Sequence, residues 1–166
     1  MAAERPYWET TALADMTPDQ WEALCDGCAR CCLHKLRDQQ SGQVYLTMVA
    51  CRLLDRQTCR CRDYGRRTEK VPACLVLSAK TVAQADWLPD TCAYRRRLAG
   101  APLAWWHPLV SGRRATVHQA GVSVRGIALS EEDVHPADWV RLILDVATPP
   151  ENGRLLKTSG HRGKGG

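Results

Sequence analysis

The sequence has no phenylalanine and no apolar run long enough to cross a membrane. A membrane-spanning helix needs about 18 consecutive apolar residues, whereas Gly100, Pro102 and Arg141 interrupt the most apolar windows. The first fifteen residues mix acidic residues and proline with apolar ones, so they lack the basic and then apolar pattern of a secretory signal. We therefore expect a soluble, cytoplasmic protein without a membrane partner.

Sequence signatures of common enzymes are also missing. The chain has no Gly-x-Gly-x-x-Gly, no phosphate-binding loop, no Gly-x-Ser-x-Gly and no His-Glu-x-x-His. These motifs are typical of dinucleotide-binding proteins, nucleotide-binding proteins, hydrolases and zinc proteases. The sequence thus predicts no particular reaction, and whether the protein is an enzyme stays open. Its 45% hydrophobic and 25% charged residues, in a chain of 166, fit one ordinary globular domain.

The positive charge is unevenly distributed. The formal net charge is +5, but residues 151–166 contribute four basic residues against one acidic residue. This segment is also rich in glycine and follows Pro149 and Pro150, a composition that buries too little apolar surface to order itself. We predict a cysteine-cluster metal-binding domain over residues 1–148 and a flexible, basic, glycine-rich tail over residues 149–166.

Cysteine is the residue type that points to chemistry. An odd number of cysteines cannot all pair within one chain, and cytosolic thiols stay reduced, so clustered cysteines there favour metal binding or redox work. Four of the nine lie within eight residues, and their two-residue gaps let neighbouring thiolates reach one ion, as in zinc and iron–sulfur sites. The predicted metal ligands are Cys25, Cys28, Cys31, Cys32, Cys51, Cys59, Cys61, Cys74 and Cys92.

The number of thiols allows more than one metal arrangement. Eight thiolates fill two separate four-coordinate sites and leave one cysteine over, whereas all nine hold three zinc ions if three sulfurs bridge. Consecutive side chains diverge, so Cys31 and Cys32 are expected to serve different ions, or one of them bridges. This crowding favours Zn²⁺. Iron or an iron–sulfur cluster is the alternative, because Cys-x2-Cys-x2-Cys also binds such clusters.

A basic stretch surrounds the cluster in the sequence. Residues 51–74 contain seven basic residues against three acidic ones. Because metal–thiolate clusters are negative, we expect these cations to balance the cluster. Contact with nucleic acid is less favoured, since Tyr64 is the one aromatic residue within residues 51–74 that could stack on a base. His34, beside Lys35, is expected to be exposed rather than a ligand, and His107 to be structural. Trp87, Trp105 and Trp106 are expected in the core.

The element signals are short and often interrupted. The fold class they indicate is a small α+β domain, irregular and helix-rich, organised around a cysteine–metal cluster, because long connections need something to order them. A helix is expected after the capping residue Thr17, with Pro18 at its first position and Gln20 completing a capping box. The other predicted elements are strands Val44–Ala50 and Val122–Ala128, a helix Asp90–Leu98, and an amphipathic helix whose apolar face comprises Trp139, Val140, Ile143, Leu144 and Ala147.

Several blocks in one order resemble a known family. The segment 25–35, with its Cys-x2-Cys-x2-Cys-Cys spacing, resembles the motif of the YkgJ-type cysteine-cluster proteins, whose CxxCxxCC domain is described as zinc- or iron-chelating. The YcgN branch is more similar still, through blocks at residues 50–54, 58–61, 71–74, 87–95, 106–109 and 124–125. The resemblance implies metal chelation. It also implies a ligand set shared across the family, with Cys59 and Cys92 specific to the branch; the shared residues are Cys25, Cys28, Cys31, Cys32, Cys51, Cys61 and Cys74.

These observations lead to one main functional hypothesis and two alternatives. We expect a cytosolic cysteine-cluster protein that chelates zinc, or iron, through several thiolates and serves as a metal-stabilised binding or adaptor module for a protein partner. The first alternative is an iron–sulfur oxidoreductase or electron carrier. The second is a nucleic-acid-binding module that uses the arginines.

Overall fold

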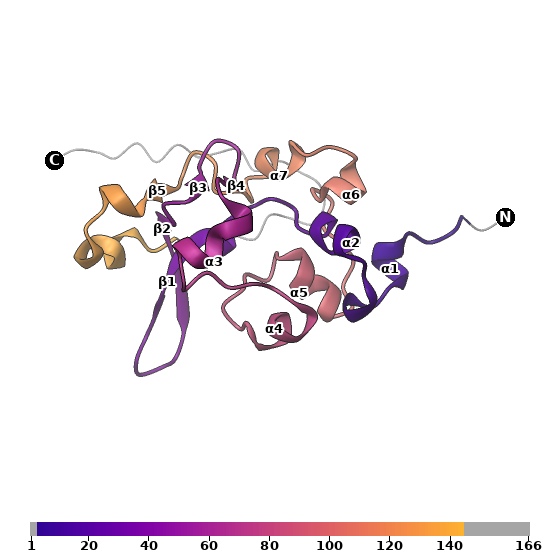
Figure 1. The fold of residues 1–166 in the computed structure, drawn as a ribbon, viewed down its shortest axis with the longest axis horizontal. Coiled ribbons are helices and arrows are strands. Elements are labelled where there is room, and N and C mark those ends of the chain that lie inside the picture. Colours follow the sequence, from indigo (N-terminus) through magenta and orange to yellow (C-terminus); the bar gives the residue numbers. More distant parts are fainter. Residues whose placement is uncertain (1–2, 145–166) are drawn as a thin grey trace.

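Short helices and strands follow one another along the chain in a computed structural model that describes residues 3–144. The helices are α1 (Tyr7–Thr10), α2 (Pro18–Ala23), α3 (Arg67–Lys70), α4 (Ala79–Gln84), α5 (Ala93–Leu98), α6 (Pro108–Ser111) and α7 (Thr116–Gln119). The 3₁₀ segments are the single turns η1 (Leu13–Asp15), η2 (Arg30–Cys32), η3 (Tyr64–Arg66) and η4 (Glu131–Asp133), and the longer η5 (Pro136–Leu142). Among the described residues no helix is long and apolar enough to cross a membrane. The expected small mixed helix-and-sheet fold is confirmed (Figure 1).

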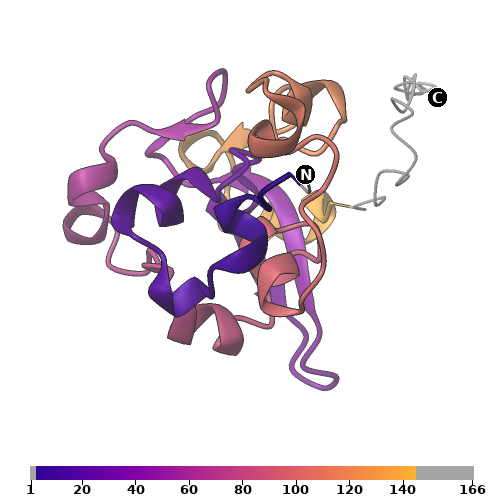
Figure 2. The same cartoon turned by 90° about the vertical axis from the view of Figure 1, so that its right-hand side faces the viewer.

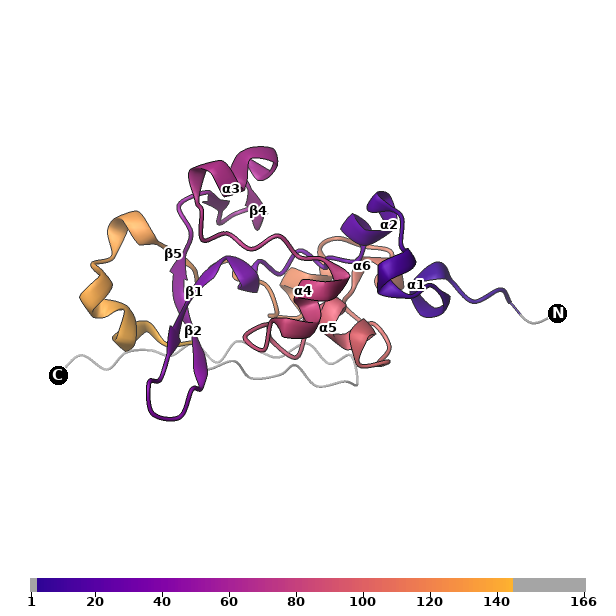
Figure 3. The same ribbon diagram turned by 60° about the horizontal axis from the view of Figure 1, so that its bottom comes forward.

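The strands form two small sheets. Strands β1 (Leu33–Arg37) and β2 (Val44–Ala50) make an antiparallel hairpin, and β5 (Leu129–Ser130) pairs with β2 in parallel. Strands β3 (Leu54–Asp55) and β4 (Arg60–Cys61) form a separate antiparallel pair. The hairpin projects beyond the helices in Figure 2, and Figure 3 shows α3 and β4 on the opposite side of the sheet from the hairpin tip. The predicted strand Val44–Ala50 is confirmed with the same bounds.

Helix α2 begins where the sequence predicts. The Thr17 side chain accepts a hydrogen bond from the Gln20 amide, and the Gln20 side chain accepts one from the Thr17 amide. This reciprocal pair satisfies two donors that the first turn of a helix leaves without partners. Helix α2 therefore fixes the direction in which the backbone continues to Leu24 and Cys25.

Three apolar clusters make up the core, and the cysteine motif passes through all of them. Leu24 lies in a cluster with residues of α4 and α5, Cys28 in a cluster with Trp106 and α7, and Leu33 in a cluster with β2 and β3. One segment of ten residues, 24–33, thus contributes buried side chains to each cluster. Because interiors are close-packed, this segment has little freedom to move as a unit.

The predicted strand Val122–Ala128 is wrong. Val122 and Val124 are fully buried, as the alternating pattern suggests, but the backbone turns between Val124 and Ala128, whose amide donates to the Val124 carbonyl at 3.0 Å. Gly126 lies in this turn with φ +82°, a left-handed conformation that glycine adopts without strain. The strand pairing begins only afterwards, at Leu129.

The predicted amphipathic helix over residues 138–147 is also wrong. The chain forms the 3₁₀ helix η5 and leaves it after Leu142, because Ile143 bridges Thr47 of β2 and the Leu144 amide donates to the Leu46 carbonyl at 2.7 Å. Pairing with the sheet therefore replaces the helical turn. Ala147, the predicted domain boundary after residue 148 and the predicted tail lie outside the described residues.

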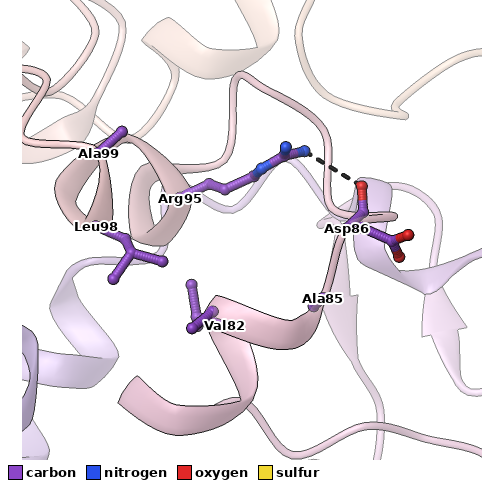
Figure 4. Close-up of a pocket in the computed structure, with 7 residues that line it drawn as sticks. Val82, Ala85, Asp86, Arg95, Leu98 and Ala99 are labelled. Atoms are coloured by element: carbon purple, nitrogen blue, oxygen red, sulfur yellow. Dashed lines mark hydrogen bonds between the residues drawn. The ribbon is translucent and has the colours of Figure 1, made fainter.

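Helix α5 begins later than predicted, at Ala93 rather than near Asp90, and Cys92 is its N-cap residue. A groove of about 300 Å³ lies between α4 and α5 (Figure 4). The Arg95 guanidinium crosses it to donate to the Asp86 carbonyl at 3.4 Å, and it pairs with the Asp90 carboxylate. The groove is lined mainly by alanine, valine and leucine, so its role in the fold is packing.

Candidate metal centre

The cysteine motif bends sharply between Cys25 and Cys32. Cys25 follows α2 and is exposed, whereas Cys28 is buried. Gly27 and Ala29 both have positive φ, of +78° and +61°. For a residue with a Cβ this left-handed conformation is uncommon. These two turns fold the motif back on itself before η2, which carries Cys31 and Cys32.

Asp26 holds the first turn of the motif in place. Its carboxylate is 5% exposed and accepts hydrogen bonds from the Cys28 amide at 3.0 Å and from the Trp106 indole Nε1 at 3.1 Å. The neighbouring His107, 1% exposed, donates from Nε2 to the Leu24 carbonyl at 2.8 Å, because its Nδ1 accepts from the Leu109 amide. Burial lowers the pKa of His107. A neutral histidine with both ring nitrogens bonded is structural, as predicted.

Arg30 connects the motif to two distant segments. Its guanidinium is 5% exposed overall and donates from Nε to the Val122 carbonyl at 2.7 Å and from Nη1 to the Thr91 hydroxyl at 3.4 Å. Burial lowers the pKa of Arg30, while the neighbouring Cys28 and Asp26 raise it. A buried cation is costly unless it is paired, so Arg30 fits a site that carries negative charge. Thr91 directly precedes Cys92, so the contact also places that thiol.

Four thiols interact around this buried framework: Cys25, Cys28, Cys31 and Cys92. Burial, and then the charge of Cys31, raises the pKa of Cys25 to about 12. Burial likewise raises the pKa of Cys28, with contributions from Asp26, Cys31 and Cys25. Each thiol therefore makes its neighbours harder to ionise. We call these four residues the first thiol set.

Cys92 belongs to the first thiol set in spite of its helix cap. The amides of Tyr94 and Arg95 lower its pKa, as expected from a helix N-terminus, but burial outweighs them and raises the pKa of Cys92 to about 11. The charges of Cys31 and Asp26 add to the rise. The helix terminus therefore lowers the pKa of Cys92 too little to favour the thiolate in this structure.

A second thiol set comprises Cys32, Cys51, Cys61 and Cys74. The Cys51 amide donates to the Cys32 carbonyl at 2.9 Å at the end of the β1–β2 ladder, and Cys61 pairs with Leu54 in β4. Cys74 ends the turn after α3, where its amide donates to the Val71 carbonyl at 2.8 Å. The charges of Cys51 and Cys61 both raise the pKa of Cys74. The four cysteines of this set come from segments spread over 43 positions in the sequence.

Cys31 and Cys32 join the two sets. The Cys32 thiol donates to Cys31, which lowers the pKa of Cys31 to about 7 and raises that of Cys32. Lys35 contributes to the lowering, and its Nζ donates to the Cys31 and Leu33 carbonyls at 2.7 Å each. The same ammonium lies 4.3 Å from the centroid of the Trp87 ring. A thiol that ionises near neutral pH is the most nucleophilic kind and the readiest metal ligand.

Cys59 differs from the other eight thiols. It is 4% exposed and packs among the apolar residues of the second core cluster, including Leu54 and Ala128. Its φ of +57° places it at the tip of the β3–β4 turn, where its amide donates to the Asp55 carbonyl at 2.8 Å. A buried free cysteine of this kind behaves as a small apolar residue.

The donor set fits a soft metal ion, since thiolates prefer Zn²⁺ or iron over hard cations. Within residues 3–144, however, no three or more His, Cys, Asp or Glu side chains stand as a group that could hold a metal ion. Closing either thiol set on one ion requires the side chains to turn toward one another. An organised cysteine–metal core is thus a proposal, not a feature of this structure.

His34 is not the exposed histidine that was predicted. Its Nε2 lies 2.8 Å from the Glu131 carboxylate, and its ring stacks on Trp139 with centroids 4.4 Å apart. The same carboxylate accepts from the Arg52 amide at 2.7 Å. The expected core positions hold for Trp106, which is buried, while Trp87 and Trp105 are partly buried against the clusters.

Asp26 and Arg30 are the functional candidates that sequence reasoning missed. They are the two charged residues between Cys25 and Cys31, but their partners Trp106 and Val122 lie 80 and 92 positions away. Their position between closely spaced cysteines is the one sequence feature that could have indicated their importance. It does not identify Trp106 or Val122 as their partners.

Comparison with known proteins identifies similar sequences. Residues 24–93 match the CxxCxxCC family model, described as a "Putative zinc- or iron-chelating domain". A UPF0260 protein of Gluconacetobacter diazotrophicus is 55% identical over 139 residues, covering 81% of this chain and 87% of the relative. UPF0260 proteins of Mesorhizobium japonicum and Marinobacter nauticus are 51% and 53% identical over 144 residues each, covering 86% and 87% of this chain and 97% of each relative. No solved structure matches.

Proposed function

The chain belongs to the UPF0260 protein family, and we propose that it binds two metal ions, each through one set of four thiolates. The first ion would be held by Cys25, Cys28, Cys31 and Cys92. The second would be held by Cys32, Cys51, Cys61 and Cys74. Cys59 would remain a free, apolar core residue. Eight ligands then fill two four-coordinate sites, as closed structural zinc sites require.

The observation that carries this proposal is the pattern of charge interactions among the thiols. Burial raises the pKa of Cys25, Cys28 and Cys74, and the charges of neighbouring cysteines add to the rise in each, so several thiolates together would repel one another without a cation between them. A divalent ion supplies that charge. Because the ligands must lose protons, binding releases protons and becomes stronger as the pH rises.

The residues around the thiols would have distinct roles. Asp26 would fix the Cys28 amide and the turn of the motif, and Arg30 would offset the negative charge of the first site from within the core. Lys35 would lie against both sites, since Cys31, Cys32 and Cys74 all raise its pKa. When bound, the metal ions would cross-link the segments that carry the thiols.

We further propose that the metal is zinc, that the compartment is the reducing cytosol, and that the module binds a protein partner. The adjacent thiols Cys31 and Cys32 fall into different sets, which suits two neighbouring tetrahedral ions better than one cuboidal cluster. All nine cysteines are free thiols, as a reducing compartment requires. Nucleic acid is disfavoured because Arg52, Arg66 and Lys70 of the basic stretch are already ion-paired with carboxylates.

Metal analysis of the purified protein and three matched variants tests the proposal. We expect two zinc ions per chain in the native protein, one in Cys28→Ser, one in Cys51→Ser, and two in Cys59→Ser, which serves as the control. Loss of an ion in Cys59→Ser, or retention of both in the other two variants, would contradict the assignment. A brown preparation bleached by dithionite would replace zinc by an iron–sulfur cluster and favour an electron carrier.

A further inference from the structure

A cleft opens beside Cys25, on the side of the first thiol set that faces solvent. It has a volume of about 500 Å³ and is lined by residues from the end of α2, from β4 and from the segment around α6. These residues include Glu22, Ala23, Cys25, Arg60, Pro108, Leu109, Gly112 and Arg114. Helices α2 and α6 lie next to each other in Figures 1 and 3. The cleft is within the size range of pockets for small molecules.

Two arginines give the cleft its charge. Among the described residues, neither the Arg60 nor the Arg114 guanidinium forms a hydrogen bond or ion pair with the protein, and both residues are exposed, so their N–H donors are available to a ligand. The one carboxylate of the lining, Glu22, accepts from the Tyr64 hydroxyl at 3.1 and 3.2 Å. Cations with low-dielectric walls around them concentrate anions from solution.

Arg60 is held against the cysteine motif. A Cβ on Gly27 would lie 3.6 Å from the Arg60 Nη2 atom, so this guanidinium covers the turn between Cys25 and Cys28. Arg60 and Cys25 both line the cleft, so a donor for an anion stands in the same cleft as Cys25.

The remaining walls are apolar. Pro108, Leu109 and Ala23 line the cleft, and the nearest aromatic residue of the basic stretch, Tyr64, is engaged with Glu22. At Gly112, which ends α6 with φ +72°, no heavy atom would lie within 4 Å of an added Cβ. The cleft thus offers two cationic side chains, an apolar wall and open space beside Gly112.

We propose that this cleft binds a small organic anion, whose carboxylate or phosphate oxygens are held by Arg60 and Arg114 and whose carbon skeleton packs on Pro108 and Leu109. Guanidinium groups bind both kinds of oxyanion through paired hydrogen bonds. The cleft proposal depends on the proposed metal sites in one respect only, which is the role of Cys25. If Cys25 is a metal ligand, the bound anion lies beside the first ion, and the module recognises a ligand as well as a metal.

The test is a residue-resolved NMR titration of the full chain, as purified, with benzoate, phenyl phosphate and the neutral analogue benzamide. We expect saturable shifts at the amides of Ala23, Gly112 and Arg114 with at least one of the two anions, and none with benzamide. The anion that binds more tightly identifies the preferred oxyanion.

Three variants make the test specific. Arg60→Gln and Arg114→Gln should each weaken binding by about tenfold, or ~1.4 kcal/mol. The exposed neighbour Arg113, which does not line the cleft, is the control, and Arg113→Gln should bind as the native protein does. The same spectra show whether each variant is folded.

Two results would overturn the inference. One is the absence of a saturable shift with either anion. The other is equal weakening in all three variants, which would indicate nonspecific electrostatic attraction, of the kind that also draws basic proteins to nucleic acid. Metal content is measured on the same samples. Anion binding in a protein that contains no metal would support the cleft proposal and reject the proposed metal sites. Metal content without anion binding would support the metal sites and reject the cleft proposal.

Discussion

The two thiol sets differ in what supports them. The first set is surrounded by buried side chains that are hydrogen-bonded without any metal: Asp26 to the Trp106 indole, His107 to the Leu24 carbonyl, and Arg30 to the Val122 carbonyl. Apart from Cys32 in η2, the second set is carried by residues 51–77, where Leu54 and Cys59 are the buried residues and neither η3 nor α3 buries any side chain. Similar thiol chemistry thus rests on a rigid framework in one region and on surface turns in the other.

This difference teaches that an ion would matter unequally to the two regions. A segment that buries little apolar surface cannot offset the entropy of ordering its backbone. For such a segment the free energy of metal binding is also free energy of folding. The first set would be positioned before an ion arrives, and the second would be assembled by one.

The largest effect should follow removal of metal by a chelator. Structural zinc contributes roughly 10 kcal/mol or more to folding, so residues 51–77 should lose order while residues 24–33 keep theirs. Hydrogen exchange reports this directly. The amides of Val71 and Cys74 should lose protection, and that of Val124, which donates to the Cys28 carbonyl, should retain it. Equal loss in both regions would erase the distinction between the sets.

The next largest effect should come from Arg30→Met. Removing one partner from a buried, charged network costs about 3 kcal/mol or more, so the free energy of unfolding should fall by that order in urea denaturation. Arg30→Lys keeps the charge but lacks the planar fork, and should fall between the native protein and Arg30→Met. Arg113→Met, on an exposed arginine, is the control. If Arg30→Met is as stable as this control, the framework of the first set does not depend on the buried cation.

Trp106→Phe should have a smaller effect. The change removes the indole N–H that donates to Asp26 and leaves the buried carboxylate with one protein donor fewer. The expected loss is about 1–3 kcal/mol of unfolding free energy. Metal affinity of the first set should weaken while that of the second is unchanged, which competition with a chromogenic chelator on Cys51→Ser and Cys28→Ser backgrounds resolves. Weakening of both sets would show that they are coupled.

The smallest effect at neutral pH concerns His107, because the ring is already uncharged there. Burial lowers the folded-state pKa of His107 below the usual histidine value of 6.5, so the unfolded chain takes up a proton first as the pH falls. The stability contributed by the neutral ring is present above pH 6.5 and is lost on acidification through the lower folded pKa. Melting temperatures between pH 8 and about pH 5 should fall less steeply in His107→Gln. If the melting temperatures of the native protein and His107→Gln fall equally steeply, His107 does not contribute to the loss of stability at low pH.

Parts of this fold were predictable because their signals are local. The capping box at Thr17 and Gln20 and the apolar strand Val44–Ala50 depend on neighbours within a few residues, and both predictions are confirmed. Val122 and Val124 show the limit of such signals. Their alternation correctly indicates burial, but the turn around Gly126 and contact with Cys28 decide the backbone.

The candidate site divides in the same way. The cysteines themselves and the family are visible in the sequence, since thiol spacing is a local property. Their division into two sets is not, because Cys92 joins Cys31 through a helix cap and Cys74 joins Cys51 through a separate turn. The failed helix over residues 138–147 has the same cause, since Thr47 and Leu46 compete for its backbone.

The long-range contacts of the cysteine motif set an order of events during synthesis. A chain made from its N-terminus completes the second thiol set when Cys74 emerges. The first set has to wait for Cys92, for the Trp106 indole and for the backbone at Val122 and Val124 that fastens Arg30 and Cys28. For much of translation, Cys25 and Cys28 are therefore part of a nascent chain that lacks the residues that hold them in place in the folded protein. If the two proposed sites bind metal, a ribosome paused before Val122 would display a chain whose second site is complete and whose first site is not.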